Sequence, residues 1–339
     1  MIVRIQVVKQ VYAADITTWL DTNSTLSVSV LSLEPRINWY DFQNSNNISK
    51  LNTQIDVNQE YKFIINVSSD QGWDDIEFIN ITAWYDNGNE STTYNNSGNL
   101  GGNLNLFLQY ENTTGTGNNA VYRMLWPDDE ATKGTLTEVV STDPSGSPGN
   151  TDCYNITFPF TPGYQFRYAP NPANSAAGYN DLKSWNFNIT VLDTSNKIDY
   201  KINEFGIYSY TEVASAGMPT IQGTPGENAT AASSVSVITR SNNNYSLYVD
   251  VDTLVHTQNP AFTMPNTTVW VRGADVSSWT NFDGNNPIYL YGDETTYLNA
   301  SDNDTSKMAS DIDYKVDIPN PQQAGDYNAT ISYFLRTQI

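Results

Sequence analysis

Alternating apolar and polar residues predict a chain that is built of short β-strands. Successive side chains of a strand point to opposite faces, so strict alternation marks a strand with one buried face. No window of ten residues or more shows the periodicity of an amphipathic helix. Turn-forming Gly, Asn, Pro and Ser separate the strand-like runs. The expected strands are 25–33, 36–42, 60–68, 76–85, 104–110, 120–126, 135–140, 154–160, 184–192, 197–212, 234–240, 245–252, 267–272, 287–291, 312–318 and 327–337.

Many short strands with turns between them favour an all-β fold of two tandem antiparallel β-sandwich domains of immunoglobulin-like type. Residues 214–233 are rich in Gly, Pro, Ala and Thr, and we interpret them as a linker. Residues 1–213 would form the first and larger domain, whose long loops at 86–103, 111–119 and 141–153 are typical of interaction or glycan-bearing loops. Residues 234–339 have the length of one immunoglobulin-like sandwich.

The first fourteen residues carry a further strand pattern, in which Val3, Ile5 and Val7 would share one face. Arg4 and Lys9 interrupt the apolar core that a signal peptide needs, so the segment is a poor export signal. Two interpretations stay open. The strand could complete the first domain of its own chain, or it could add to the sheet of a neighbouring copy by β-augmentation.

Composition excludes several function classes. The chain has 16 Lys and Arg against 37 Asp and Glu, a formal net charge of −21, and such acidity argues against binding nucleic-acid phosphates. No apolar stretch is long enough for a membrane span. Cys153 and His256 are the only residues of their types, which excludes an intrachain disulfide and a common zinc site. We expect no enzyme, with Cys153 as a small strand residue and His256 as a loop residue.

Asn-x-Ser/Thr sequons occur about twice as often as the Asn, Ser and Thr content alone predicts. At Asn155, Asn188 and Asn328 the sequon falls on the polar side of an alternating strand, which favours glycosylation of an exported chain over mere Asn richness. The fifteen candidate acceptors are Asn23, Asn47, Asn66, Asn80, Asn89, Asn95, Asn112, Asn155, Asn188, Asn228, Asn244, Asn266, Asn299, Asn303 and Asn328.

Calcium is the cofactor that the acidic loops favour, because hard cations prefer several oxygen ligands. None of the clusters has EF-hand spacing, and solvated acidic loops are the alternative interpretation. The candidate ligands are Asp70, Asp74, Asp75, Asp283, Asp293, Asp302 and Asp304.

Three segments of the second domain resemble the C-terminal modules of secreted archaeal surface proteins. They are VSVITRSNNNYSLYVDVDTL (235–254), VWVRG (269–273) and DYKVDIPNPQQAGDYNATISYFLRTQ (313–338). The dense sequons, the acidity and the scarcity of Cys are also similar to archaeal S-layer glycoproteins. The resemblance covers about a third of the chain. It implies immunoglobulin-like architecture and an extracellular, cell-surface location, and it carries no catalytic residues.

The first functional hypothesis is therefore a structural protein that self-assembles with its own copies into an extracellular lattice, such as an S-layer or a sheath. One alternative is an extracellular filament whose subunits are joined by strand donation. The other is a glycan-binding or adhesive module, because Trp and Tyr can stack on sugar rings. A lattice of such acidic subunits would need cations between them to reduce repulsion.

Overall fold

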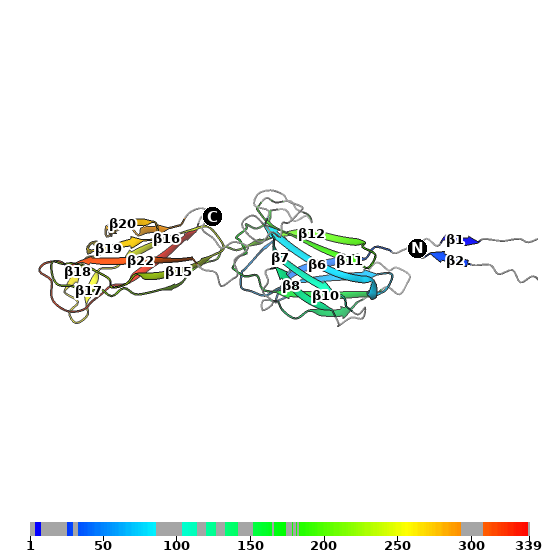
Figure 1. Ribbon diagram of the computed structural model, residues 1–339, viewed down its shortest axis with the longest axis horizontal. Coiled ribbons are helices and arrows are strands. Elements are labelled where there is room, and N and C mark those ends of the chain that lie inside the picture. Colours follow the sequence, from blue (N-terminus) through cyan, green and yellow to red (C-terminus); the bar gives the residue numbers. More distant parts are fainter. Residues whose placement is uncertain are drawn as a thin grey trace, which may run out of the picture.

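The computed structural model describes most of the chain and gives it two β-sandwiches, arranged end to end, and an N-terminal ribbon (Figure 1). Apart from two 3-10 turns, η1 (Trp73–Asp75) and η3 (Asn266–Thr268), the described elements are all strands. The predicted all-β fold is therefore confirmed. The described residues are 4–7, 26–29, 33–85, 104–113, 120–126, 133–141, 152–164, 166–173, 178, 181, 183–292 and 308–337.

The first sandwich consists of two sheets that are antiparallel except where β4 runs parallel to β12. One sheet has the order β3-β5-β10-β9 and the other β4-β12-β11-β6-β7-β8. Their bounds are β3 (Arg36–Asn44), β4 (Gln54–Ile55), β5 (Tyr61–Ser69), β6 (Ile76–Tyr85), β7 (Leu104–Glu111), β8 (Val121–Trp126), β9 (Thr137–Val140), β10 (Asp152–Phe160), β11 (Trp185–Asp193) and β12 (Ile198–Ile207).

Aromatic side chains from both sheets fill the core between them. The rings of Phe42 and Phe63 stack with their centroids 4.5 Å apart, and Phe187 of the opposite sheet meets Phe63 edge-on at 5.2 Å. All three side chains are fully buried. Alternation in the sequence therefore encodes the inner face of each sheet, and aromatic packing holds the two inner faces together.

The second sandwich has its own hydrophobic core. One sheet has the order β13-β15-β22-β19-β20, with β14 also on β22, and the facing sheet has the order β21-β16-β24. A small sheet, β18-β17-β23, lies apart from both. The bounds are β13 (Thr211–Ala216), β14 (Asn228–Thr230), β15 (Val235–Ser241), β16 (Tyr245–Val251), β17 (Leu254–His256), β18 (Thr263–Met264), β19 (Val269–Gly273), β20 (Val276–Asn281), β21 (Ile288–Tyr291), β22 (Met308–Asp317), β23 (Tyr327–Asn328) and β24 (Ile331–Thr337).

The run at 197–212, expected to be one strand, is divided between the two sandwiches. β12 ends at Ile207, and β13 begins at Thr211 and pairs with β15 of the second sandwich. β13 extends into the expected linker 214–233, and β14 lies inside it. β13 forms because its backbone pairs with β15, and β14 forms because its backbone pairs with β22. The Gly and Pro content of this segment does not predict either pairing. The division at residue 213 stays a prediction.

Asn242, in the turn between β15 and β16, connects the two sandwiches. Its buried side chain donates hydrogen bonds to the carbonyl oxygens of Phe166 (3.0 Å) and Tyr208 (2.9 Å), and it accepts one from the Tyr210 N–H (2.8 Å). Its backbone oxygen accepts from the Tyr168 N–H at 2.8 Å. One amide side chain therefore satisfies backbone groups of two separate segments beside the junction, which restrains the hinge between the sandwiches.

Candidate functional site

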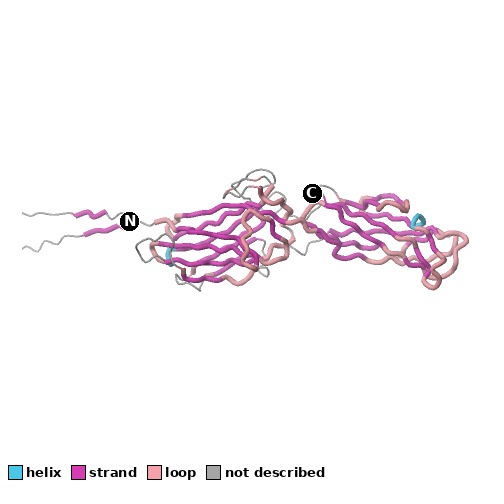
Figure 2. The backbone as a smooth tube through the Cα atoms, turned by 180° about the vertical axis from the view of Figure 1, so that it is seen from behind, coloured by secondary structure: helices cyan, strands magenta, loops and turns pink. Residues whose placement is uncertain are grey.

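The N-terminal ribbon lies outside both sandwiches. β1 (Arg4–Val7) and β2 (Leu26–Ser29) pair antiparallel with each other, with Ile5 opposite Val28 and Val7 opposite Leu26. They form a separate two-stranded sheet at the end of the first sandwich that is farther from the second (Figures 1 and 2). Leu26 and Val28 are 63% and 49% exposed. A two-stranded ribbon is only marginally stable by itself in water.

This arrangement bears on the two interpretations of the N-terminal strand. In the described structure β1 pairs with β2 and with no strand of the first sandwich, so it does not complete that domain. Ile5 and Val7 lie in β1, as the alternation predicts, and Val3 lies outside the described residues. Augmentation of another copy's sheet stays a prediction.

One corner of the first sandwich is protected against pairing with an added strand. Where the end strand β3 meets β12 at one corner of the first sandwich, carboxylates occupy backbone N–H groups. Asp199 accepts from the N–H of Ile37 (2.7 Å) and from that of Tyr200 (2.8 Å), and Asp41 accepts from the N–H of Phe42 (2.8 Å). Side chains that occupy edge donors in this way protect a sheet from pairing with another chain.

The end strand β24 of the second sandwich is not protected in this way. It pairs with β16 on one side, and β13 lies close to its other side without forming a ladder with it. Ile331, Tyr333 and Leu335 pack against the core, yet each remains only partly buried. Phe334 points outward and is 47% exposed. Among the described residues β24 therefore has a strand ladder on one side only and incompletely covered apolar side chains, two features that an added strand would use.

The predicted glycan acceptors divide by exposure. Three of the described acceptors are exposed and six are partly buried, whereas Asn66 is fully buried and donates to Asn155 Oδ1 at 2.7 Å. The folded chain has no room for a glycan at Asn66, because its side chain lies between β3 and β10. The exposed three are Asn47, Asn228 and Asn328; the partly buried six are Asn80, Asn112, Asn155, Asn188, Asn244 and Asn266; and Asn23, Asn89, Asn95, Asn299 and Asn303 lie outside the described residues.

The described calcium candidates are not gathered around a common centre. Asp70 forms a two-pronged ion pair with Arg36, at 2.8 Å for both bonds. Asp75 is nearly buried and accepts from hydroxyl groups, while Asp74 beside it is exposed. Within the described residues, no group of three His, Cys, Asp or Glu side chains could hold a metal ion. Asp293, Asp302 and Asp304 lie outside them, and Asp283 accepts hydrogen bonds within its own turn.

His256 and Cys153 occupy structural positions. The His256 Nδ1 accepts the backbone N–H groups of Gln258 and Asn259, both at 3.1 Å, so the ring organises the turn after β17. Cys153 lies buried in β10 beside the Asn66 side chain, with 3.4 Å between Sγ and Oδ1. Both contacts tie the side chain to the local fold. Cys153 is a strand residue, as expected, whereas His256 is not a loop residue: it lies buried at the end of β17, where it pairs with Tyr327 of β23.

Comparison with known proteins gives only distant structural matches. No family model matches the chain, and no curated protein matches it. Among solved structures, a chain of a chaperone–tip adhesin complex of CFA/I fimbriae is similar at 9% identity with a TM-score of 0.29, over 88% of this chain and 84% of that one. The C-terminal domain of the Streptococcus pyogenes antigen I/II-family protein AspA is similar at 10% identity with a TM-score of 0.21, over 90% and 96%.

The C-terminal domain of the Streptococcus agalactiae antigen I/II polypeptide BspA matches at 12% identity with a TM-score of 0.21, over 88% of this chain and 96% of that one. TM-scores this low do not establish a common topology. The all-β assignment therefore rests on the strands themselves. Among the described residues, none of the helical segments has the length and apolar character that crossing a membrane would require.

Proposed function

We propose that this chain is a subunit of an extracellular assembly, in which the N-terminal ribbon of one copy pairs with the β24 edge of the next. The observation that carries the proposal is the ribbon itself, whose β2 side chains Leu26 and Val28 are exposed and belong to neither core of the described residues. Apolar side chains held in this position are stabilised when another surface removes them from water.

The positions of donor and acceptor favour a filament. The ribbon projects from the far end of the first sandwich, and β24 lies in the second sandwich on the other side of it (Figures 1 and 2). The ribbon of a chain therefore meets the β24 edge of another chain more readily than its own. Repetition of this head-to-tail contact gives an open chain of subunits, because the contact joins different surfaces and does not close on itself.

Charge does not oppose this pairing. Residues 1–29, which carry both ribbon strands, contain Arg4 and Lys9 against Asp15 and Asp21, so the donor segment is neutral in a chain of net −21. A neutral donor avoids the repulsion that two acidic surfaces would experience.

The lattice version of the assembly, the calcium ions between subunits and the N-linked glycans belong to the same proposal as predictions. Lateral contacts between filaments would be needed to form a sheet. Exposed sequons at Asn47, Asn228 and Asn328 would place glycans on the outside of either assembly. Glycosylation of these sequons requires export of the chain, so finding it would support an extracellular location at the cell surface.

Cysteine cross-linking tests the pairing directly. Leu26→Cys on the ribbon and Phe334→Cys on β24 give one exposed thiol each, and Cys153 is buried. We expect a mixture of the two single variants to form covalent dimers with a short bis-maleimide. The double variant should form a ladder of oligomers on a denaturing gel.

The matched control is Val140→Cys, which places a thiol on β9, another end strand with an apolar residue that is 75% exposed. Leu26→Cys mixed with Val140→Cys should remain monomeric. Equal cross-linking to both positions, or to Val140 alone, would show that β24 is not the acceptor. Assembly of a chain that lacks residues 1–29, seen by electron microscopy, would show that the ribbon is not the donor.

A further inference from the structure

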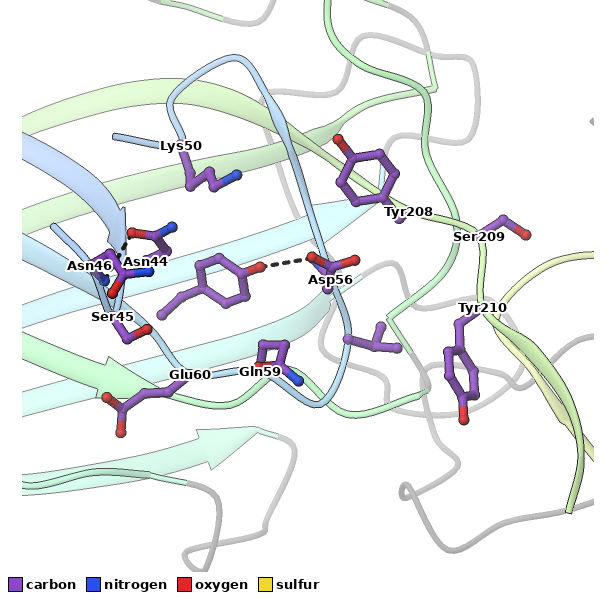
Figure 3. A pocket seen from close by; sticks show the side chains of 12 residues that line it. Asn44, Ser45, Asn46, Lys50, Asp56, Gln59, Glu60, Tyr208, Ser209 and Tyr210 are labelled. Atoms are coloured by element: carbon purple, nitrogen blue, oxygen red, sulfur yellow. Dashed lines mark hydrogen bonds between the residues drawn. The ribbon is translucent and has the colours of Figure 1, made fainter. Parts of the chain in front are cut away.

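A polar pocket lies beside the junction of the two sandwiches, and the assembly described above makes no use of it. Its volume is about 440 Å³, within the usual range of small-molecule sites. Its walls come from three segments: the turn that follows β3, the loop that leads into β5, and residues 208–210, which connect β12 to β13 (Figure 3). The pocket is therefore built from parts of the chain that are far apart in sequence.

Charged and polar side chains surround this space, and some are already paired, as where the Asn44 Oδ1 accepts the Asn46 N–H at 3.1 Å (Figure 3). The side chains of Lys50, Asp56 and Tyr208 lie around it (Figure 3). Among the described residues, the Lys50 ammonium, the Asp56 carboxylate and the Tyr208 hydroxyl have no hydrogen-bond partner. Tyr208 is 47% exposed, so its ring is accessible from the pocket. Lys50 provides donors, Asp56 provides acceptors, and Tyr208 provides a flat apolar face with a hydroxyl at its end.

Tyr61 adds a buried hydroxyl to the same wall. It accepts a hydrogen bond from the Asp56 backbone N–H at 2.9 Å. Its own proton has no acceptor among the described residues. Burial is the main reason that the pKa of Tyr61 is raised above 10.0, so the proton stays on the hydroxyl and can be donated to a ligand.

The mixture of charged, amide and aromatic side chains in the pocket favours some classes of ligand over others. Apolar ligands would leave the ammonium and the carboxylate desolvated and unpaired, which is costly. A phosphate group would meet the Asp56 and Glu60 carboxylates with only Lys50 to balance them. A sugar ring carries hydroxyl groups that both donate and accept, and it has an apolar face that can lie on an aromatic ring. Asn46 adds a side-chain amide that can donate and accept, and Asn44 adds amide N–H groups, while its Oδ1 already accepts the N–H groups of Asn46 and Ile48.

We propose that this pocket binds a hexopyranose unit of a glycan, with the sugar face on Tyr208 and hydroxyl groups bonded to Lys50, Asp56 and Tyr61. The site is separate from the ribbon and from β24, so it is a second binding activity of the subunit. Because Tyr208 also accepts the Asn242 side-chain bond through its backbone oxygen, the pocket wall is held in place by the junction.

Saturation-transfer NMR with the full chain tests the proposal. The probes are the methyl glycosides of glucose, mannose, galactose and N-acetylglucosamine, each at millimolar concentration. At least one should receive saturation from the protein, and Tyr208→Ala or Lys50→Met should weaken its binding about tenfold or more. Tyr200→Ala is the matched control, because it removes an equally exposed tyrosine on β12 outside the pocket.

Saturation transfer to none of the four glycosides would overturn the proposal. Binding that Tyr208→Ala and Tyr200→Ala leave equally intact would also overturn it, because the sugar would then bind elsewhere. Cross-linking between the ribbon and β24 is measured in variants whose pocket residues are unchanged. Failure of sugar binding and failure of assembly are thus independent results.

Discussion

Replacing Asn242 with Ala should loosen the junction between the sandwiches. The substitution removes three side-chain hydrogen bonds, to Phe166 O (3.0 Å), Tyr208 O (2.9 Å) and Tyr210 N (2.8 Å). It leaves their backbone partners beside a cavity that the lost amide formerly filled. At about 1 kcal/mol for each bond, the expected loss of stability is roughly 3 kcal/mol.

Two assays measure this effect. Thermal unfolding followed by circular dichroism should show a midpoint lowered by about 6–12 °C, taking roughly 2–4 °C for each kcal/mol in domains of this size. Small-angle X-ray scattering should show a broader distribution of maximum dimension, because the junction near Tyr210 would lose its side-chain restraint and keep only the backbone hydrogen bonds of residue 242. Asn285→Ala is the control, since this exposed asparagine bonds only within its own turn. It should change stability by less than about 0.5 kcal/mol.

Asn242→Asp provides the sharper test, because the side chain keeps its shape and loses both donors. An aspartate would direct oxygen atoms at the carbonyl groups of Phe166 and Tyr208, so we expect it to destabilise at least as much as the alanine. Wild-type stability and scattering in the aspartate variant would refute the role assigned to the two donated bonds. If Asn242→Ala lowers the stability no more than Asn285→Ala does, Asn242 does not stabilise the junction.

Three further predictions concern other parts of the molecule. Phe187→Ala, which opens the aromatic core of the first sandwich, should lower the free energy of unfolding by about 3–5 kcal/mol in urea titrations, and a loss below 1 kcal/mol would contradict the packing described. Peptide mapping of native protein should find glycan at exposed Asn328 and none at buried Asn66, and an occupied Asn66 would contradict its burial. Hydrogen bonds from Ser234, and next from Arg272, lower the pKa of Asp313 in the folded protein below its ordinary value of 3.8. The ionised carboxylate therefore stabilises the fold above pH 3.8, and this contribution is lost as the pH falls through the lower folded pKa. Unfolding of an Asp313→Asn variant should depend less on acid pH than unfolding of the wild type, and an unchanged dependence would contradict this role.

Much of the fold follows from the sequence because strand formation in this chain is encoded locally. The alternation in WNFNITVLD places Phe187, Ile189 and Val191 on one face, and the structure buries all three in β11. A period of two is enough to assign the inner face, whichever strand becomes the neighbour. The sequence also identified Ile5 and Val7 as strand residues.

Tertiary structure alone decided the partners of those strands. Residues 211–216 read as part of a longer strand and a linker, and pairing with β15 made them an edge strand of the second sandwich. Asn66 carries the same acceptor pattern as Asn328, but its neighbours β3 and β10 bury it. The open edge at β24, the junction at Asn242 and the pocket at Tyr208 depend on which segments meet in space. Local alternation specifies a strand's two faces but not its neighbours, since backbone hydrogen bonding is the same for every sequence.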